Sequence, residues 1–382
     1  MISSLAHVPA VQWNACVDDN EPFTEHAFLY ALETSRSVGE RTGWLPQFVL
    51  VWQGQTLAGA VPLYLKDNSY GEYIFDWAWA QGAARGGIAY YPKLVAAVPF
   101  TPATGRRLLV HPSCERAPIV SALLDGVQKV AQTHDVSSVH FLFCTEGELR
   151  ELNAVGYRSR LSYQFHWHNR SPQPYKNFDD FLSAFRSPSR KQVKKERRIA
   201  AGHGLRIGLR EGGQMNEREW QAVGKLYDEN ADKHGAITYL TPAFFQALRD
   251  TFAHRIVTTF AYDGEQPVAG TLNFEKGTHI YGRYWGCEVE REMLHFELCY
   301  YQLIDRAIER GHCLFEAGAQ GEHKLKRGLM PSFTHSAHLI VDPSLDRAIA
   351  GFLTHEQNVV KHHVQEYTRH APYNRGDEVP LP

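Results

Sequence analysis

The order of elements in this chain repeats itself, and this repetition constrains the fold more than any other feature. Residues 51–63 have nearly the same pattern as residues 261–273 when one inserted residue is allowed. Gly54 matches Gly264, and an Ala-Gly pair follows each of them. In both places a glycine turn joins two runs with the character of a β-hairpin. The match favours an internal duplication.

The two halves also share the order of elements after each hairpin. In the first half we expect strands at 48–52, 58–65, 70–79 and 139–143, with a helix at 119–132. In the second half we expect strands at 256–262, 268–274, 278–285 and 313–316, with a helix that ends at Gly311. This alternation predicts an α/β fold, in which a mixed sheet is flanked by helices.

We place the boundary between the halves near residues 168–176. The predicted domains are residues 1–168 and residues 169–382, and a long closing helix at 344–369 belongs to the second. In the strand-like run 70–79, the aromatic residues alternate with Glu72 and Asp76. We expect the aromatic face either in the core or along the wall of a groove, and we take Asp76 as a candidate contact for substrate.

Composition excludes several classes of function. The chain has 382 residues and a formal net charge of -2, which argues against general binding to DNA or to a membrane surface. No apolar run is long enough to span a membrane. Residues 1–20 have neither the basic nor the apolar region of a leader peptide, so we expect none. The six cysteines form no Cys-x-x-Cys pair, which is typical of reduced thiols. From these features we expect a cytoplasmic protein. We also expect no metal site, because the 20 histidines lack acidic partners at ligand spacing.

Residues 313–331 are the leading candidate for a functional site. An apolar run ends at Glu316, and Gly318 and Gly321 then allow the backbone to turn tightly. A cluster of charged and polar side chains follows directly: Glu322, His323, Lys324, Lys326 and Arg327. A buried strand that ends in a glycine-bearing polar loop is how α/β folds position reactive groups. The alternative is a charged surface turn.

A second candidate is the basic run at residues 190–198, which holds six basic residues among nine. On a helix these six side chains share one arc, while Val193 and Glu196 take the other side. Arg190, Lys194 and Arg197 form one stripe of the basic arc. Like charges on one face of a near-neutral protein favour an anionic ligand that bears phosphate. The alternative is a solvated surface.

Several segments resemble known acyltransferases. Residues 185–198 look like the segment that begins the second half of Fem-type aminoacyltransferases, and residues 315–328 look like the Fem strand and loop at the site. Residues 26–33, 70–73, 90–94 and 318–324 look like the FemAB-like bacterial family, which is linked to peptidoglycan biosynthesis or recognition. The resemblance covers nearly the whole chain. It implies tandem GNAT-like domains, with the active site in the second.

The resemblance also implies a reaction, namely transfer of an aminoacyl or acyl group to an amine, with a peptidoglycan-type precursor as one acceptor. In that reading Glu316, His323 and Tyr284 are catalytic candidates. The residues expected to bind substrate are Lys324, Lys326, Arg327, Arg283, Arg190, Lys194, Arg197 and Asp76. The donor is aminoacyl-tRNA or, alternatively, acetyl-CoA. A recognition protein without catalysis is the third alternative, and the oligomeric state is left open.

One departure bears on the donor. An acetyl-CoA enzyme of the GNAT type carries a glycine-rich loop before its central helix, where backbone N–H groups hold pyrophosphate. Here the corresponding residues 286–294 contain one glycine followed by Glu288, Glu290 and Glu292. Acids near a helix N-terminus compete with phosphate. The departure therefore favours the Fem-type donor.

Overall fold

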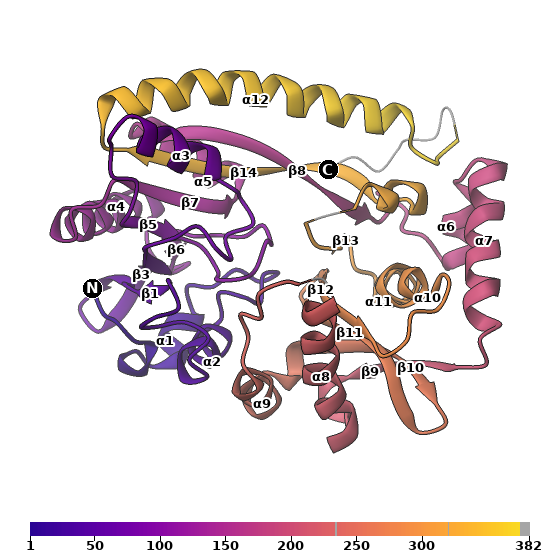
Figure 1. Ribbon diagram of the computed structural model, residues 1–382. Helices are drawn as coiled ribbons and strands as arrows, with labels where there is room; N and C mark the ends of the chain where they lie inside the picture. Colours follow the sequence, from indigo (N-terminus) through magenta and orange to yellow (C-terminus); the bar gives the residue numbers. More distant parts are fainter. Residues whose placement is uncertain (234, 320, 375–382) are drawn as a thin grey trace. The chain divides into compact units, whose positions relative to one another are not determined.

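The structure is a computed structural model that describes residues 1–233, 235–319 and 321–374 (Figure 1). It divides into two compact units. The first comprises Met1–Ser162, Tyr239–Phe244 and Phe333–His362, and the second comprises Tyr163–Thr238, Phe245–Ser332 and the chain from His363. Residues 333–362 thus cluster with the first unit, whereas the sequence division assigns them to the second domain. No helix among the described residues is both long and apolar enough to cross a membrane.

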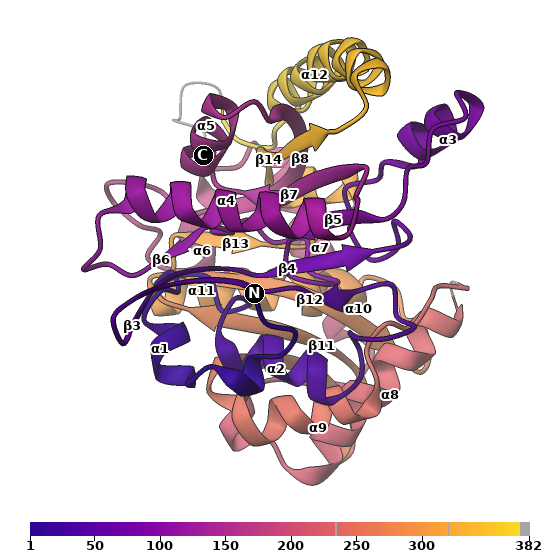
Figure 2. The same ribbon diagram turned by 90° about the vertical axis from the view of Figure 1, so that its left-hand side faces the viewer.

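The first unit is built on two sheets (Figure 2). The smaller sheet contains β2 (Val49–Gln53), β3 (Thr56–Val61) and β6 (Leu109–Val110). The larger contains β1 (Leu45–Pro46), β4 (Leu63–Lys66), β5 (Lys93–Ala96), β7 (Ser138–Cys144) and residues 335–340 of β14 (Met330–Ile340). The buried stripe of α4 (Arg116–Thr133), with Ile119, Leu123 and Val127, packs on both.

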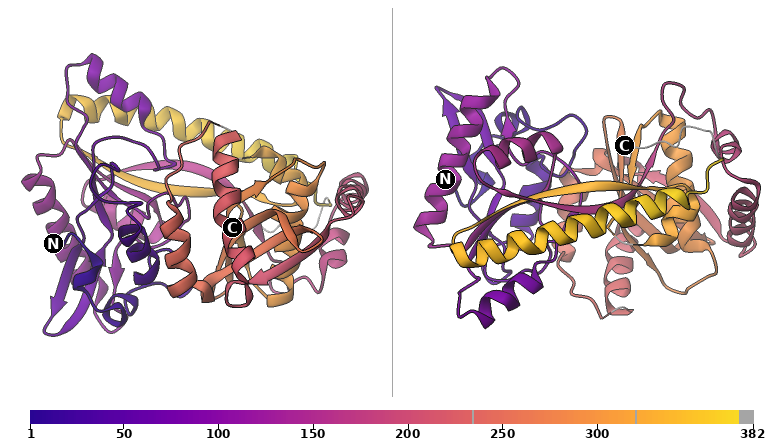
Figure 3. Two further views of the ribbon diagram at one scale, coloured as in Figure 1. Left: turned by 60° about the horizontal axis from the view of Figure 1, so that its bottom comes forward. Right: turned by 90° about the horizontal axis from the view of Figure 1, so that it is seen from above.

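Shorter helices complete the first unit. They are α1 (Ala10–Asn14), α2 (His26–Thr34), α3 (Trp77–Arg85) and α5 (Glu146–Ala154), together with the first part of α12 (Pro343–Arg369). Helix α5 begins at a capping box, in which Thr145 and Glu148 satisfy each other's backbone N–H groups. Helices α3 and α12 lie side by side (Figures 1 and 3), because Trp79 and Ala83 pack against Leu345, Ile349 and Leu353.

The second unit holds one mixed sheet. Strands β9 (Arg206–Glu211), β10 (Ile256–Asp263), β11 (Gln266–Lys276) and β12 (His279–Cys287) are antiparallel neighbours. Strand β13 (Leu314–Glu316) then runs parallel to β12, and β8 (Arg158–His168) pairs with it in the antiparallel sense through residues 166–168. The helices are α6 (Phe178–Ser183), α7 (Ser187–Ala201), α8 (Glu217–Lys233), α9 (Pro242–Thr251), α10 (Leu294–Phe296) and α11 (Gln302–Arg310). Between α10 and α11 lies the π-helical turn η4 (Glu297–Tyr301).

The two units repeat one pattern of strand pairing. In the first, β4–β5 is antiparallel, β5–β7 parallel and β7–β14 antiparallel. In the second, β11–β12, β12–β13 and β13–β8 follow the same sequence of senses. A helical connection joins the parallel strands in both units, through α4 in one and through α10, η4 and α11 in the other. This shared pattern supports the duplication that the sequence indicates.

The strand expected at residues 70–79 is wrong. The chain there forms an irregular loop that leads into α3. Gly71 and Tyr73 have φ angles of 76° and 61°, in the left-handed region, and this conformation cannot continue a strand. Burial does not follow the alternating pattern, since Glu72 and Asp76 are buried, Phe75 and Trp77 are exposed, and Trp79 is buried. Most other predicted elements are confirmed. The helix that the sequence predicts at residues 220–234 corresponds to α8, and its predicted last residue, 234, lies outside the described residues.

Candidate functional site in the second unit

The site in the second unit starts from two strands that separate. β12 and β13 pair only through residues 279–281 and 314–316, after which β12 continues to Cys287 while β13 stops at Glu316. The chain then turns at Gly318 and Gly321, whose φ angles are 80° and 111°, into the 3-10 helix η5 (Glu322–Arg327). Side chains from β13 and η5 therefore gather where the two strands part. Glu316 is among them and is buried.

Lys324 is the most unusual side chain of this group. It is 2% exposed, and its Nζ donates a hydrogen bond of 2.8 Å to the carbonyl oxygen of Gly318. Burial lowers the pKa of its ammonium from 10.5 to about 7, and the neighbouring Cys299 opposes this shift only in part. At neutral pH the amine therefore exists in both protonation states.

His323 lies beside Lys324 among aromatic rings. Its Nε2 is 2.9 Å from the hydroxyl of Tyr300, and its ring is 5.4 Å from that of Phe296. Partial burial, together with the cations Arg327 and Lys324, lowers the pKa of His323. The same causes, with burial first, lower the pKa of His295 to about 4. Both imidazoles are therefore neutral near pH 7, so they can accept a proton or donate a hydrogen bond.

Arg327 braces this loop. Its Nη2 lies 2.9 Å from the carboxylate of Glu196, and its Nη1 donates a 2.6 Å hydrogen bond to the backbone oxygen of His323. The guanidinium also lies 3.3 Å from the ring centroid of Phe296. These contacts leave Arg327 almost fully buried. Arg327 therefore links η5 to α7 through its contacts with His323 and Glu196.

Glu196 is a residue that the sequence analysis missed as part of the site. It is buried on α7, where it also accepts hydrogen bonds from Tyr301 and, at 3.0 Å, from Gln192. The helical pattern places Glu196 on the apolar side with Val193, which the structure confirms. Its partner, 131 residues further along the chain, gives no local signal in the sequence.

The two candidates on β12 occupy different surroundings. The ring of Tyr284 packs edge-on against Tyr227 of α8, with ring centroids 5.0 Å apart. The neighbouring Trp285 instead contacts His295, at 5.2 Å. Because side chains of a strand alternate between faces, Tyr284 belongs to the α8 side and Trp285 to the side of η5. Arg283 is half-buried, with its guanidinium 5.4 Å from the Tyr284 ring.

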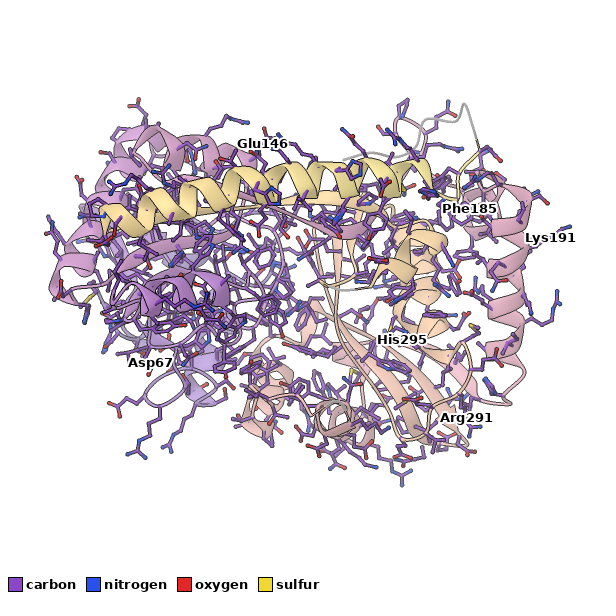
Figure 4. All side chains as sticks on the ribbon, turned by 45° about the horizontal axis from the view of Figure 1, so that its top comes forward. Asp67, Glu146, Phe185, Lys191, Arg291 and His295 are labelled. Atoms are coloured by element: carbon purple, nitrogen blue, oxygen red, sulfur yellow. The ribbon has the colours of Figure 1, made fainter. Side chains whose placement is uncertain are left out.

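The basic residues of α7 divide into two groups. Arg197 forms 3.0 Å ion pairs with Glu297 and Asp305 and lies over the ring of Phe178, so it anchors the helix. Lys194 is exposed and lies 3.0 Å from Asp179. Arg190 is half-buried. Other exposed cations of the run are Lys191, which points outward in Figure 4, Lys195 and Arg198. Lys326 of η5 is exposed as well.

Asp76 lies in the first unit, in a buried cluster of its own. Lys93 donates hydrogen bonds to Asp76, to Glu72 at 2.9 Å and to Ser69 at 2.9 Å. Burial opposes ionisation of Asp76, but Lys93 and further partners outweigh it and lower its pKa to about 2. Burial also raises the pKa of Glu72 to about 7. Asp76 is therefore a charged partner of a buried lysine.

Metal ligation finds no support in the residues that the structure describes, among which no three His, Cys, Asp or Glu side chains are grouped to hold an ion. Glu316, His323 and Lys324 lie at the end of β13 and in η5, close to where β12 and β13 separate. Their roles in a reaction remain a prediction.

Comparison with known proteins identifies the fold. No curated protein matches the sequence. The crystal structure of FemX matches with a TM-score of 0.53 at 14% identity, over 90% of this chain and 98% of that one. The structure of L-PGS from Bacillus licheniformis matches with a TM-score of 0.51 at 9% identity, over 85% of this chain and 94% of that one. The mixed α/β, Fem-like fold predicted from the sequence is confirmed.

A family model extends the comparison from fold to ancestry. The FemAB-like model, described as peptidoglycan biosynthesis/recognition, matches residues 4–375. That range includes both units and the polar loop that carries His323 and Lys324. The chain belongs to the FemAB-like family.

Proposed function

We propose that this protein is an acyltransferase that moves an aminoacyl or acyl group from an activated ester onto an amine of a peptidoglycan-type precursor. Membership in the FemAB-like family and the Fem-like fold support a transferase. The observation that carries the proposal is Lys324, a buried amine whose pKa of about 7 suits proton transfer at neutral pH.

In the proposed reaction the amine of the acceptor attacks the ester carbonyl. A C–N bond forms, the carbonyl oxygen gains negative charge, and the ester C–O bond then breaks. The ammonium form of Lys324 stabilises the oxyanion, and the neutral form takes a proton from the attacking nitrogen. The leaving alcohol receives the proton that Lys324 took from the attacking nitrogen, which regenerates the neutral amine. One lysine can serve both needs because burial keeps both of its forms populated.

The neighbouring groups orient the reactants. Glu316 lies at the end of β13 and orients the acceptor amine, which requires a fixed acceptor oxygen near the point of attack. His323 is a second hydrogen-bonding group, held by Tyr300. Arg327 acts through the backbone oxygen of His323, which it fixes in place. Tyr284 packs β12 against α8 through Tyr227, and the guanidinium of Arg283 lies near the Tyr284 ring.

Two observations favour a tRNA-linked donor over acetyl-CoA. A Cβ atom at Gly286 would lie 2.0 Å from the backbone oxygen of Leu226, so this glycine serves close packing between β12 and α8 rather than the approach of a pyrophosphate. Glu290 and Glu292, which follow it, are exposed and negatively charged. Such a segment repels phosphate.

The exposed basic residues of α7 are the proposed contact for a phosphate-bearing ligand. Reversing two charges, in Arg190→Glu with Lys194→Glu, should weaken binding of aminoacyl-tRNA about a hundredfold and reduce its dependence on salt. Arg197 is left unchanged because it holds the helix in place. If the double variant binds aminoacyl-tRNA with wild-type affinity, the basic residues of α7 form a solvated surface and do not contact the ligand.

The test of function compares two donors. The purified protein is incubated with an amine acceptor and either a pool of aminoacyl-tRNA or acetyl-CoA, and the mass gained by the acceptor is measured. We expect an aminoacyl mass from the first donor and none from the second. Thermal denaturation with acetyl-CoA is the companion measurement, because a ligand stabilises the folded state that binds it. An acetyl mass together with a rise in the denaturation temperature would replace this proposal with N-acetyl transfer.

A further inference from the structure

A row of polar side chains crosses three strands of the second unit. Tyr281 of β12 is the register partner of Glu316 of β13, and Glu316 is in turn the partner of His166 of β8. Partners in register point to the same face of a sheet. All three residues are buried, with exposed fractions of 1%, 4% and 4%. His166 therefore lies beside Glu316 and away from bulk water.

The next row of the same strands is apolar. Ile280, Phe315 and Trp167 point to the other face and belong to the hydrophobic core of the second unit. The polar row is thus confined to one face, where a carboxylate and an imidazole are buried together. Burial of such groups is costly, and functional sites are where this cost is commonly found.

The first unit has a cross-strand pair at the equivalent place of the repeated frame. His140 is the third residue of β7, as Glu316 is of β13, and its partner on β14 is His338. The Nδ1 atoms of these histidines lie 2.6 Å apart, and their Nε2 atoms lie 2.8 Å and 2.9 Å from the hydroxyls of Ser138 and Ser336. The frame thus brings two side chains at this place within hydrogen-bonding distance. In the second unit a carboxylate replaces one histidine of the pair.

Gln164 determines which nitrogen of His166 carries the proton. The Nε2 atom of His166 lies 3.3 Å from Oε1 of Gln164, and an amide oxygen only accepts, so Nε2 is the protonated nitrogen. The pKa of this ring is lowered well below 6.5, first by burial and then by His168, Lys324 and His279. The ring is therefore neutral near pH 7, and its Nδ1 keeps a lone pair.

Two kinds of hydrogen-bond acceptor are therefore adjacent in this row. An ionised carboxylate such as that of Glu316 only accepts, and so does Nδ1 of His166. A ligand suited to both brings several N–H groups on one nitrogen, as a primary ammonium does. The nearby Lys324 carries no charge in its neutral form, which its pKa of about 7 keeps populated, so it does not exclude a cation from this place.

The transfer reaction proposed for the second unit moves more than one proton. An alkylamine has a pKa of about 10.4, so the acceptor arrives as an ammonium without a lone pair. One proton must leave before the nitrogen attacks the ester. A second leaves once the C–N bond has formed, and Lys324 passes it to the leaving alcohol. The third stays on the nitrogen of the amide product.

We propose that Glu316 and His166 form the subsite for the primary ammonium of the acceptor, an inference that rests on the transfer reaction proposed above. Glu316 takes the first proton: an N–H bond breaks, an O–H bond forms, and the electron pair stays on the nitrogen. Nδ1 of His166 accepts the N–H that remains in the amide, which orients the lone pair for attack. Glu316 releases its proton to water between turnovers. Pairing of β12 with β13 ends at this row, so the acceptor approaches from the end where the strands separate.

The experiment supplies the full-length protein with a pool of aminoacyl-tRNA and one of two acceptor peptides. The first peptide is acetyl-lysyl-alanine. The second carries an aminooxy group in place of the lysine amine, and this group is uncharged at neutral pH and needs no deprotonation. The mass gained by each peptide is followed over time.

The two site residues should respond differently to the two peptides. His166→Phe removes an acceptor atom that both peptides use, so transfer to both should fall at least about tenfold. His166→Asn places an amide oxygen near the position of Nδ1 and should recover most of this loss. Glu316→Gln should slow transfer to the lysine peptide about a hundredfold, and transfer to the aminooxy peptide at most about tenfold.

The matched control is His168→Phe. His168 lies on the same face of β8, but its register partner is Leu314, and its Nε2 lies 3.1 Å from the hydroxyl of Ser332. This variant should transfer to both peptides like the wild type. Thermal denaturation of each variant shows whether it is folded.

The wild-type protein gives a second measurement that does not depend on the folding of a variant. The nitrogen-15 resonance of His166 Nδ1 should move when the lysine peptide is added, and it should stay in place with a peptide that has norleucine instead of lysine. A resonance that ignores saturating lysine peptide would overturn the inference.

The outcomes separate this inference from the proposed reaction. If the wild type is active and His166→Phe transfers to both peptides at the wild-type rate, the subsite is wrong and the reaction stands. A folded His166→Asn that is as slow as His166→Phe would also contradict the subsite, because it would show a structural role. If the wild type transfers nothing to either peptide, the proposed reaction fails and the subsite fails with it.

Discussion

Each unit buries a lysine near its parallel strand pair, but the two lysines have opposite surroundings. In the first unit, Lys93 contacts two carboxylates, and these partners outweigh burial and raise its pKa. In the second, Lys324 has a backbone carbonyl as its hydrogen-bond acceptor, and burial lowers its pKa to about 7. A paired buried lysine stabilises a conformation, whereas a buried lysine that faces a neutral carbonyl is prepared for proton transfer. We propose that the repeated frame supports structure in the first unit and chemistry in the second.

The strongest test of this contrast is Lys93→Met. The substitution removes the cation that contacts both Glu72 and Asp76, although Lys66 remains 3.7 Å from Glu72, so the free energy of unfolding should fall by about 3–5 kcal/mol. Urea denaturation measures the loss. Lys129→Met, at an exposed position of α4, is the control and should change stability little. A loss below about 1 kcal/mol from Lys93→Met would mean that the cluster is not what holds the loop.

Lys324→Met should behave in the opposite way. Transfer activity should fall on the order of a hundredfold, because a proton-transfer group is lost, while the folded protein is retained or becomes more stable. Lys324→Arg should also be inactive, since a guanidinium does not release its proton near neutral pH. Lys129→Met, at an exposed position of α4 that is assigned no role in the reaction, is the control for activity as well. Full activity in Lys324→Met would remove this lysine from the mechanism.

A double-mutant cycle on Glu196 and Arg327 measures how much their buried ion pair contributes to the free energy of unfolding. Substituting each by its uncharged analogue, Gln or Met, and then both together should give a coupling energy of about 1.5–3 kcal/mol. The exposed pair Lys194 and Asp179 offers a matched comparison, for which we expect less than about 1 kcal/mol. Similar coupling in both cycles would show that burial adds nothing to the brace.

The pH dependence of stability sharpens the comparison further. Between about pH 7 and pH 10.5 the unfolded chain keeps the Lys324 proton while the folded protein has released it. The free energy of unfolding should therefore rise with pH in this window, by at most about 1.4 kcal/mol per pH unit from this group. Lys66 contributes in the same direction, since burial also lowers its pKa to about 7. Lys324→Met should flatten the rise, and an unchanged slope would contradict the lowered pKa.

Regular elements were predictable because their patterns are local. The buried stripe of α4, with Ile119, Leu123 and Val127, follows helical spacing in the sequence. The polar loop at 318–327 was predictable because its glycines and charges are contiguous. The strand predicted at residues 70–79 is wrong, because an alternating pattern alone does not say which side chains face inward. Here ion pairs with Lys93 and Lys66 hold Glu72 and Asp76 inward, and both lysines lie outside the segment.

The roles of individual site residues were harder to predict than their place. Arg327 and Arg197 have the composition of ligand contacts, yet each is engaged by an acid from a different element, Glu196 and Glu297. Such pairing depends on tertiary contacts more than 90 residues apart. His295 was missed because it lies within an apolar helical stripe, where a core role is the simpler interpretation. The lowered pKa of Lys324 depends on burial, which spacing along the chain does not reveal.

The discontinuity of the first unit has a consequence for how the protein is made. Its sheet is completed by residues 335–340 of β14, and its helix α3 packs on α12, but both of these segments lie near the end of the chain. During synthesis, the edge of β7 that pairs with β14 stays unpaired until nearly the whole of the second unit has emerged from the ribosome. Exposed strand edges are sites of aggregation. Completion of the first unit must therefore wait until nearly all of the second unit has been synthesised, and a nascent chain stopped before β14 should depend on chaperones to stay soluble.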